Sequence, residues 1–380
     1  MTVQPRSSQS GFTLLELMIA MGVMLLVLAS TMQVMKDAMG ATTTTKQMLD
    51  MNSHLRASMD LMQRDMLQVG QGLPVGRRIG IPNGFGSTPV VRPGPAATGA
   101  CAGVTTFPLD STIPAVSAGP DLGPPINGEC TDVVTIMAAD NLFEPVATAS
   151  IAAAGGSAVI HDDVNISDDP DVNSDNLRAG DLLMFTKGTM SVLMQVTAVA
   201  GQTVTFGTGA LDPLGLNQLD PTLAVAGTIN QLKAQAPVDG DAPVVVGAVQ
   251  QRGPSQVTRI RMLTYFVDTT TNPQSPRLVR AVGGAPPTVV SMGLQMLRLS
   301  YDIADQINNP TSVRMDDDDL SGAGACSPDP CSENQIRKVN LVLAMRAHDQ
   351  GSNSRNGRQS QNTLYTQVSL RSMAFVDRYR

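Results

Sequence analysis

The feature that most limits the fold of this chain is a long stretch without proline. The chain contains 25 prolines, but none lies between Gly11 and Leu73. Proline inside a helix removes a backbone hydrogen bond and clashes with the preceding turn, so its absence here favours one uninterrupted helix. Gly70 and Gly72 followed by Pro74 are typical of a helix C-terminus. We therefore expect a long helix over residues 12–70 and a different kind of structure after it.

The first half of this helix is apolar enough to cross a membrane. Between Phe12 and Met35 the only charged residue is Glu16. At about 1.5 Å per residue this range is longer than the ~30 Å hydrocarbon core of a bilayer. We predict a transmembrane segment over residues 12–35, rich in methionine, since 12 of the 22 methionines lie between Met1 and Met66. An acid in lipid needs a partner, which makes Glu16 a candidate functional residue that requires a cation.

The second half of the helix is mixed, with apolar residues at heptad-like spacing. This spacing predicts a stripe that packs on another surface. The surface is either the chain's own C-terminal part or the helices of other subunits. The stripe comprises Met48, Leu55, Met59, Met62, Met66 and Val69.

A secretory signal peptide is the main alternative for the first 29 residues. Three observations count against it. The polar leader before Phe12 has only Arg6 as a charged residue, the apolar run is about twice the usual length for a signal peptide, and Glu16 lies inside that run.

After residue 70 the composition becomes that of strands and loops, because proline and glycine recur and short β-branched runs appear. We expect residues 71–380 to form a β-rich head, and leave open whether it divides into ranges of about 71–250 and 251–380. The segment Ala179–Phe206 is predicted to form three antiparallel strands with turns at 187–188 and 200–201. The fold class is α+β. The predicted strands cover residues 132–137, 181–185, 192–199, 203–206, 258–267, 277–282, 296–301, 339–346 and 363–370.

Composition also excludes some classes of partner. Only 3% of the residues are aromatic and the net charge is -7. A nucleic-acid interface needs a basic surface to neutralise phosphates, and single-strand binders add aromatic rings for base stacking. We therefore expect no nucleic-acid partner.

The residues Gly11 to Leu17 read GFTLLEL, and this segment resembles the processing site of type IV prepilins. The resemblance implies that a prepilin peptidase cleaves between Gly11 and Phe12, so that residues 1–11 are a leader. It also implies N-methylation of Phe12, and pairing of Glu16 with a Phe12 amine, its own or a neighbour's, which sets the register during assembly. A glycine at the cleavage site allows close approach to the backbone, because it has no Cβ.

The order of the C-terminal strand segments is similar to that of the large minor pilins of the PilW family, and also to the type II secretion pseudopilin J. The length of 380 residues suits the PilW family better. The resemblance implies a type IV pilin-like fold and a structural role in a tip complex that primes filament assembly. The alternatives are a pseudopilus tip subunit, and an adhesin or calcium-dependent binding module.

The resemblance also implies partners and a location. The partners would be the inner membrane before assembly, the inner-membrane assembly platform, the prepilin peptidase, and other minor and major pilins contacted through the N-terminal helix. The head would lie in the periplasm and later on the cell surface.

All four cysteines, Cys101, Cys130, Cys326 and Cys331, lie in the head, which suits an oxidising compartment. Three pairings are possible, and proximity in sequence favours Cys101 with Cys130 and Cys326 with Cys331.

No pattern typical of a hydrolytic or redox enzyme occurs, so we expect no catalytic residues and no cofactor. His54, His161 and His348 are far apart in sequence. The acidic segment 161–175 alternates oxygen donors at Asp163, Asn165, Ser167 and Asp169, so a calcium loop is the alternative to a solvated acidic loop. The run Asp316–Asp319 is interpreted as a second solvated loop.

Overall fold

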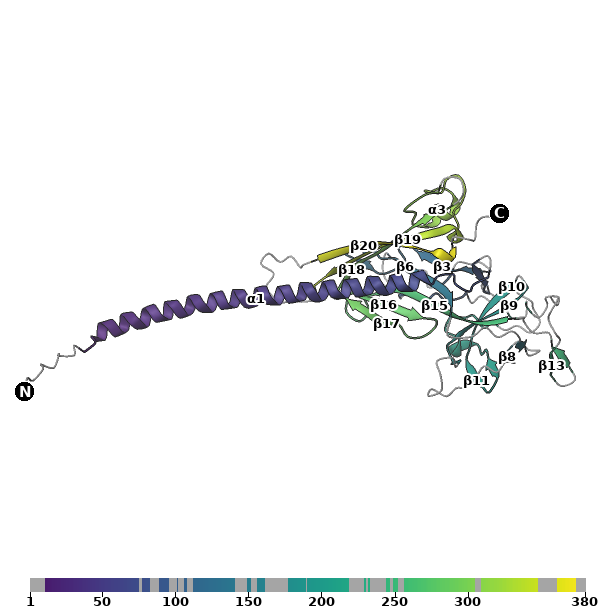
Figure 1. Cartoon of the computed structure of the whole chain (residues 1–380), viewed down its shortest axis with the longest axis horizontal. Coiled ribbons are helices and arrows are strands. Elements are labelled where there is room, and N and C mark those ends of the chain that lie inside the picture. The colour runs from purple at the N-terminus through teal and green to yellow at the C-terminus, as the bar shows by residue number, and fades with distance from the viewer. Residues whose placement is uncertain are drawn as a thin grey trace, which may run out of the picture. The chain divides into compact units, whose positions relative to one another are not determined.

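The structure of the protein is a computed structural model (Figure 1). It divides into two compact units: residues 1–52 with 347–360, and residues 53–346 with 361–380. The structure describes residues 11–74, 77–82, 89–95, 101, 106–107, 112–140, 149–151, 156–160, 177–188, 190–218, 229, 232, 244–246, 249–251, 256–304, 309–347 and 361–373.

Helix α1 (Leu14–Leu67) is continuous, as the absence of proline predicts. It ends where two glycines adopt left-handed backbone angles, with φ of 74° at Gly70 and 68° at Gly72. The chain then passes very close to the sheet, because the Gly70 N–H donates to the Met137 carbonyl at 2.9 Å. A Cβ on Gly72 would lie only 2.5 Å from the Cβ of Ala139. Glycine is therefore required at the helix exit for both conformation and space.

The last turns of α1 bury the predicted apolar stripe against the head. Leu55, Met59, Met62, Met66 and Val69 are all buried. This confirms packing on the chain's own head for that part of the stripe. Met48 is exposed and belongs to the other unit.

The end of α1 packs on a large sheet. Strands from both predicted head ranges contribute to this sheet. The strands run in the order β17-β16-β15-β9-β10-β1-β2, while β6 pairs with both β15 and β3. Pairing is antiparallel except between β1 and β10. The strands are β1 (Arg78–Gly80), β2 (Thr112–Pro114), β3 (Val116–Gly119), β6 (Val133–Ala139), β9 (Leu182–Lys187), β10 (Met190–Gln195), β15 (Gln256–Asp268), β16 (Arg277–Val282) and β17 (Thr288–Met292).

Four smaller sheets complete the described strands, and every predicted strand segment contains a strand. One sheet has the order β11-β12-β8-β7, another has the order β18-β19-β20, and two are hairpins. The strands are β4 (Pro125–Ile126), β5 (Glu129–Cys130), β7 (Ala149–Ile151), β8 (Ser157–Ile160), β11 (Ala198–Ala200), β12 (Thr203–Thr205), β13 (Val244–Val246), β14 (Val249–Gln251), β18 (Leu294–Ile303), β19 (Ile336–Arg346) and β20 (Gln361–Ser369).

Four short helical segments have described bounds, and they lie between or after these strands. They are the α-helix α3 (Asp317–Ser321) and the 3-10 helices η2 (Gly209–Leu211), η3 (Glu333–Gln335) and η4 (Arg371–Met373).

The prediction of three antiparallel strands over Ala179–Phe206 is only half right. β9 and β10 form the first hairpin, but β10 stops at Gln195, and β11 and β12 belong to a different sheet. The buried Asn217 side chain binds the last residue of β10, since it accepts the Gln195 N–H at 2.9 Å and donates to the Gln195 carbonyl at 2.7 Å. The Thr197 N–H then donates to Thr205, which starts the second sheet.

The head core is built mainly from aliphatic side chains around a few rings. One cluster between β9, β10, β12 and β8 centres on Phe185 and Phe206, whose ring centroids lie 5.5 Å apart in an edge-to-face arrangement. Tyr265 and Tyr301 are also fully buried. Among the described residues, most of the aromatic rings of the head are therefore buried.

Two carboxylates join the three-stranded sheet to the large sheet. Asp132, just before β6, donates its N–H to the Leu297 carbonyl of β18 at 3.0 Å and accepts the Leu299 N–H at 2.7 Å. Glu333 of η3, which precedes β19, accepts the Ala118 N–H of β3 at 2.7 Å. The two sheets are therefore held together by buried polar contacts as well as by apolar packing.

A polar contact also fixes the helix on the large sheet. Asp65 is almost fully buried and its Oδ2 lies 2.8 Å from Arg280 Nε and 2.5 Å from the Tyr265 hydroxyl, which donates to it. Tyr265 on β15 and Arg280 on β16 are directly opposite each other in the strand register. Burial raises the pKa of Tyr265, so its hydroxyl remains a donor. The three side chains set the position of α1 along the strands.

Removing Asp65 tests this contact. We expect Asp65→Ala to lower the free energy of unfolding of the head by about 1.5–3 kcal/mol, because the partly buried Arg280 guanidinium and the buried Tyr265 hydroxyl lose a charged hydrogen-bond partner. Tyr265→Phe removes one hydrogen bond and should cost about 1 kcal/mol. The exposed Asp60 of the same helix supplies the control, since Asp60→Ala should change stability by less than about 0.5 kcal/mol. Urea unfolding of the full chain in detergent measures all three, and equal values for Asp65→Ala and Asp60→Ala would contradict the assignment.

Candidate membrane and assembly site

The N-terminal end of α1 is closed by two of its own side chains. Thr13 immediately precedes the helix, and its hydroxyl accepts the Glu16 N–H at 3.3 Å. The Glu16 carboxylate in turn accepts the Thr13 N–H at 2.9 Å and the Thr13 hydroxyl at 3.0 Å. This reciprocal pattern is a capping box, which satisfies N–H groups that have no partner inside the helix. Glu16 thus has hydrogen-bond partners within its own chain.

The first half of α1 and the residues just before it present a long apolar surface that no other part of the described chain covers. Phe12 is 88% exposed, and the large apolar residues from Leu14 to Met35 are exposed with it. α1 is long and apolar enough near its start to cross a membrane, and the most apolar window has no part buried in the protein.

Two hydroxyl side chains in this segment are satisfied locally. Ser30 and Thr31 hydroxyls donate to the Val27 carbonyl at 2.8 Å and 3.0 Å. Such bonds remove the cost of placing a hydroxyl in lipid.

The predicted pairing of Glu16 with the Phe12 amine requires a group that the uncleaved chain lacks. Gly11 precedes Phe12, so the Phe12 nitrogen is part of a peptide bond. Only hydrolysis of the Gly11–Phe12 bond would create a charged amine there. That amine would lie one residue before the capping threonine, whose N–H and hydroxyl donate to Glu16.

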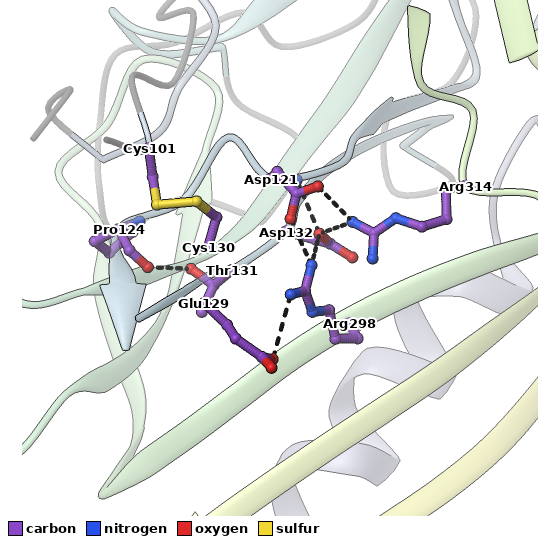
Figure 2. The surroundings of a disulfide bond; sticks show 9 residues. All are labelled: Cys101, Asp121, Pro124, Glu129, Cys130, Thr131, Asp132, Arg298 and Arg314. Atoms are coloured by element: carbon purple, nitrogen blue, oxygen red, sulfur yellow. Dashed lines mark hydrogen bonds and ion pairs between the residues drawn. A yellow bond between two sulfur atoms is a disulfide. The ribbon is translucent and has the colours of Figure 1, made fainter. Parts of the chain in front are cut away.

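In the head, the first disulfide stands next to a cluster of charges (Figure 2). Cys101 and Cys130 are joined, and Glu129 and Asp132 flank this bridge along the chain. The Asp132 carboxylate lies 2.8 Å from Arg314 Nη2 and 3.5 Å from Arg298 Nη1. Burial raises the pKa of Asp132, although the two arginines and two backbone N–H groups oppose this effect. The bridge thus anchors the segment that carries the link between the two sheets.

The second disulfide closes a compact loop with a buried acid at its centre. Cys326 is joined to Cys331, as proximity in sequence favoured. The interpretation of Asp316–Asp319 as a solvated loop is wrong for Asp319, which is buried. Its carboxylate accepts the Met315 N–H at 3.0 Å and the Ala325 N–H at 2.9 Å, and its carbonyl accepts the Cys331 N–H at 3.1 Å. These bonds use the acid to order the loop.

The remaining candidates are the histidines and the proposed calcium loop, and most of them lie outside the described residues. His54 is exposed, while His161 and His348 lie outside the described residues. The calcium candidates Asp163, Asn165 and Asp169 also lie outside them, as does Ser167. Among the residues that the structure describes, no group of three or more His, Cys, Asp or Glu is arranged to hold a metal ion.

Two features of the site escaped the sequence analysis. The spacing of Thr13 and Glu16 is the signature of a capping box, so the sequence did contain that signal. Asp65 had no comparable signal, because its partners Tyr265 and Arg280 are about 200 residues away in the chain.

Comparison with known proteins identifies the N-terminal segment. Residues 6–32 match the prokaryotic N-terminal methylation motif. No curated protein and no solved structure matches the chain. The motif and the long apolar helix give the protein a type IV prepilin-like N-terminus, and they support a type IV pilin-like or pseudopilin-like protein anchored in a membrane.

The raised pKa of Asp132 predicts a pH-dependent effect of substitution. In the unfolded chain an aspartate titrates near about 3.9. Between that pH and the raised native pKa the folded state holds more protons, so the contribution of Asp132 to stability falls as the pH rises. We expect Asp132→Asn to cost most stability at about pH 4 and less at about pH 7. Urea unfolding of both proteins across this range measures the difference, in which all other titrations cancel. A cost that grows with pH would contradict the direction given for this pKa.

Proposed function

We propose that the protein is a minor pilin of a type IV pilus, of the PilW kind, that acts in a tip complex and primes filament assembly. The observation that carries the proposal is the methylation motif at the start of an apolar helix segment that the chain itself leaves uncovered. Such a surface is stable only in lipid or against other apolar helices. A pilus subunit uses these two environments in turn.

The proposed sequence of events begins at Gly11. A prepilin peptidase hydrolyses the Gly11–Phe12 peptide bond, which leaves a carboxylate on Gly11 and an amine on Phe12, and the Phe12 amine is then methylated. Glu16 exchanges its bonds with Thr13 for the charged amine of a neighbouring subunit. The exchange keeps the carboxylate paired at every stage, because the capping box satisfies it beforehand.

The head has the properties that this role requires. Before assembly the apolar segment would lie in the inner membrane, with the head in the periplasm. The two disulfides suit that compartment and the later exposure at the cell surface. The partners would be the assembly platform and the other minor and major pilins.

Processing of the N-terminus provides the first test. Gly11→Val adds a branched side chain at the cleavage site, so we expect the chain to retain residues 1–11 and to be missing from sheared filaments. Glu16→Val should be cleaved normally but enter filaments about tenfold less or worse, because it loses its charged partner at the docking step. Ser30→Ala, which removes a different polar group from the same segment, serves as the control and should behave as the wild type. Mass spectrometry of the N-terminus and immunoblots of filaments give both readouts. Filaments that contain the chain with an intact Met1 would refute the proposal.

Loss of the whole chain separates the pilus from the secretion alternative. A strain without the protein should have far fewer surface filaments under electron microscopy, because priming fails. Normal filaments combined with loss of exoprotein secretion would instead identify a pseudopilin at the tip of a type II secretion system. Normal filaments and normal secretion would contradict both assembly roles and favour the adhesin alternative.

A further inference from the structure

The outer strand of the three-stranded sheet presents a long unpaired edge. Within the described residues, β20 pairs with β19 alone, in a regular antiparallel register over its whole length (Figure 1). The strand has no charged residue and no proline, and its pairing with β19 has no bulge. Charged residues, prolines and bulges are the features by which natural proteins usually protect an edge of this length, because an open edge binds other strands.

The opposite edge of the same sheet is closed. Tyr301 of β18 exchanges two backbone hydrogen bonds with Val313, at 2.7 Å and 2.9 Å. The Ile303 N–H also donates to the Pro310 carbonyl at 3.1 Å. The segment around Pro310 to Val313 therefore covers β18, and only the β20 side of this sheet is left without such cover in the described chain.

The hydrogen-bonding groups of β20 alternate in direction. The Leu370 N–H donates to the Arg337 carbonyl, so the even-numbered residues of the strand bond to β19. The odd-numbered residues direct their N–H and C=O groups to the open side, and each of them is exposed. The Thr363 N–H, one of these groups, is occupied only by the neighbouring Asn362 side chain at 2.8 Å. The odd-numbered residues are Gln361, Thr363, Tyr365, Gln367 and Ser369.

Side chains of β20 also form hydrogen bonds across the sheet. The Tyr365 hydroxyl donates to Asn340 Oδ1 at 3.0 Å, and Gln367 Nε2 donates to Asp302 Oδ2 at 2.9 Å and to Asn340 Oδ1 at 2.8 Å. This network crosses all three strands. Tyr365 is nevertheless 64% exposed, so its ring is available as an anchor.

A second copy of the chain is a poor occupant for this edge. Gln63 contacts Thr366, and a Cβ on Gly70 would contact Ser372, so β20 and the end of α1 run in the same direction. Antiparallel pairing of β20 with β20 of another copy would point the ends of the two α1 helices in opposite directions. Subunits that enter one membrane and one filament have these helices parallel.

We propose that the β20 edge binds an extended strand donated by a different subunit of the assembly. The partner segment supplies unpaired backbone N–H and C=O groups, and its side chains opposite Thr363, Tyr365 and Gln367 are uncharged, since a charge there would have no partner on this edge. The inference rests on the proposed function in taking the partner from the same assembly and in excluding a second copy by the parallel direction of the α1 helices.

Hydrogen exchange measured by mass spectrometry tests the proposal on the full chain. Peptides covering β20 are compared between the chain isolated in detergent and the chain in sheared filaments. We expect exchange of the outward amides to slow about tenfold or more on assembly. Thr363→Pro removes only an outward N–H, so it should leave pairing with β19 intact and abolish both the protection and incorporation into filaments. Tyr365→Lys places a charge on the edge and should act in the same way. Leu211→Lys adds the same charge on η2, outside this sheet, and should change neither.

The outcomes are distinguishable. Filaments that contain the cleaved chain without extra protection of β20 would overturn the proposal, as would wild-type incorporation of both edge variants. Protection that appears when the isolated chain alone is concentrated would show self-pairing and would also overturn it. A chain that keeps residues 1–11 and is absent from filaments would contradict the proposed function instead. The same exchange comparison is then made between isolated chain and native membranes, where unprotected β20 amides would again refute the edge contact.

Discussion

The packing of the last turns of α1 on the large sheet is the constraint on which the rest of the head depends. Leu55, Met62 and Met66 supply the apolar contact, and the pairing of Asp65 with Arg280 fixes where along the strands that contact forms. A purely apolar stripe could slide by one turn with little loss, since methionine adapts to many neighbours. A buried carboxylate cannot, because every other position would leave two charges unpaired.

The same principle recurs between the large sheet and the three-stranded sheet. The backbone and carboxylate of Asp132 bind the edge of β18 in the way that a neighbouring strand would. Arg298 and Arg314 compensate part of the cost of burying the Asp132 carboxylate. The Cys101–Cys130 bridge limits how far this segment can move. A head with few aromatic rings thus obtains its fixed geometry from a small number of satisfied polar groups, each of which would be costly to misplace.

The sequence allowed prediction of features that depend on neighbouring residues. The helix, the apolar segment and the strand segments follow from proline distribution and from periodicity. Features that depend on distant residues did not follow. Asn217 binds the last residue of β10 from a position about 20 residues away, and nothing in the 190–206 segment itself indicates that the chain changes sheets there. Asp319 shows the converse error, because a run of acids suggested solvent although one carboxylate finds backbone donors and is buried. Burial of a charge depends on its partners, which local composition does not reveal.

The methionines of α1 divide into two groups with different chemical fates. Met59, Met62 and Met66 are sealed in the head, whereas Met18, Met21, Met24, Met32 and Met35 are uncovered. A thioether becomes a polar sulfoxide on contact with oxidants, and such a group no longer suits an apolar contact. Lipid or a bundle of helices would shield the uncovered group, but a subunit that stays in water between the two would accumulate this damage. For the proposed pilus subunit, this arrangement favours a direct transfer from membrane to filament, in which the apolar segment never remains in an oxidising solution.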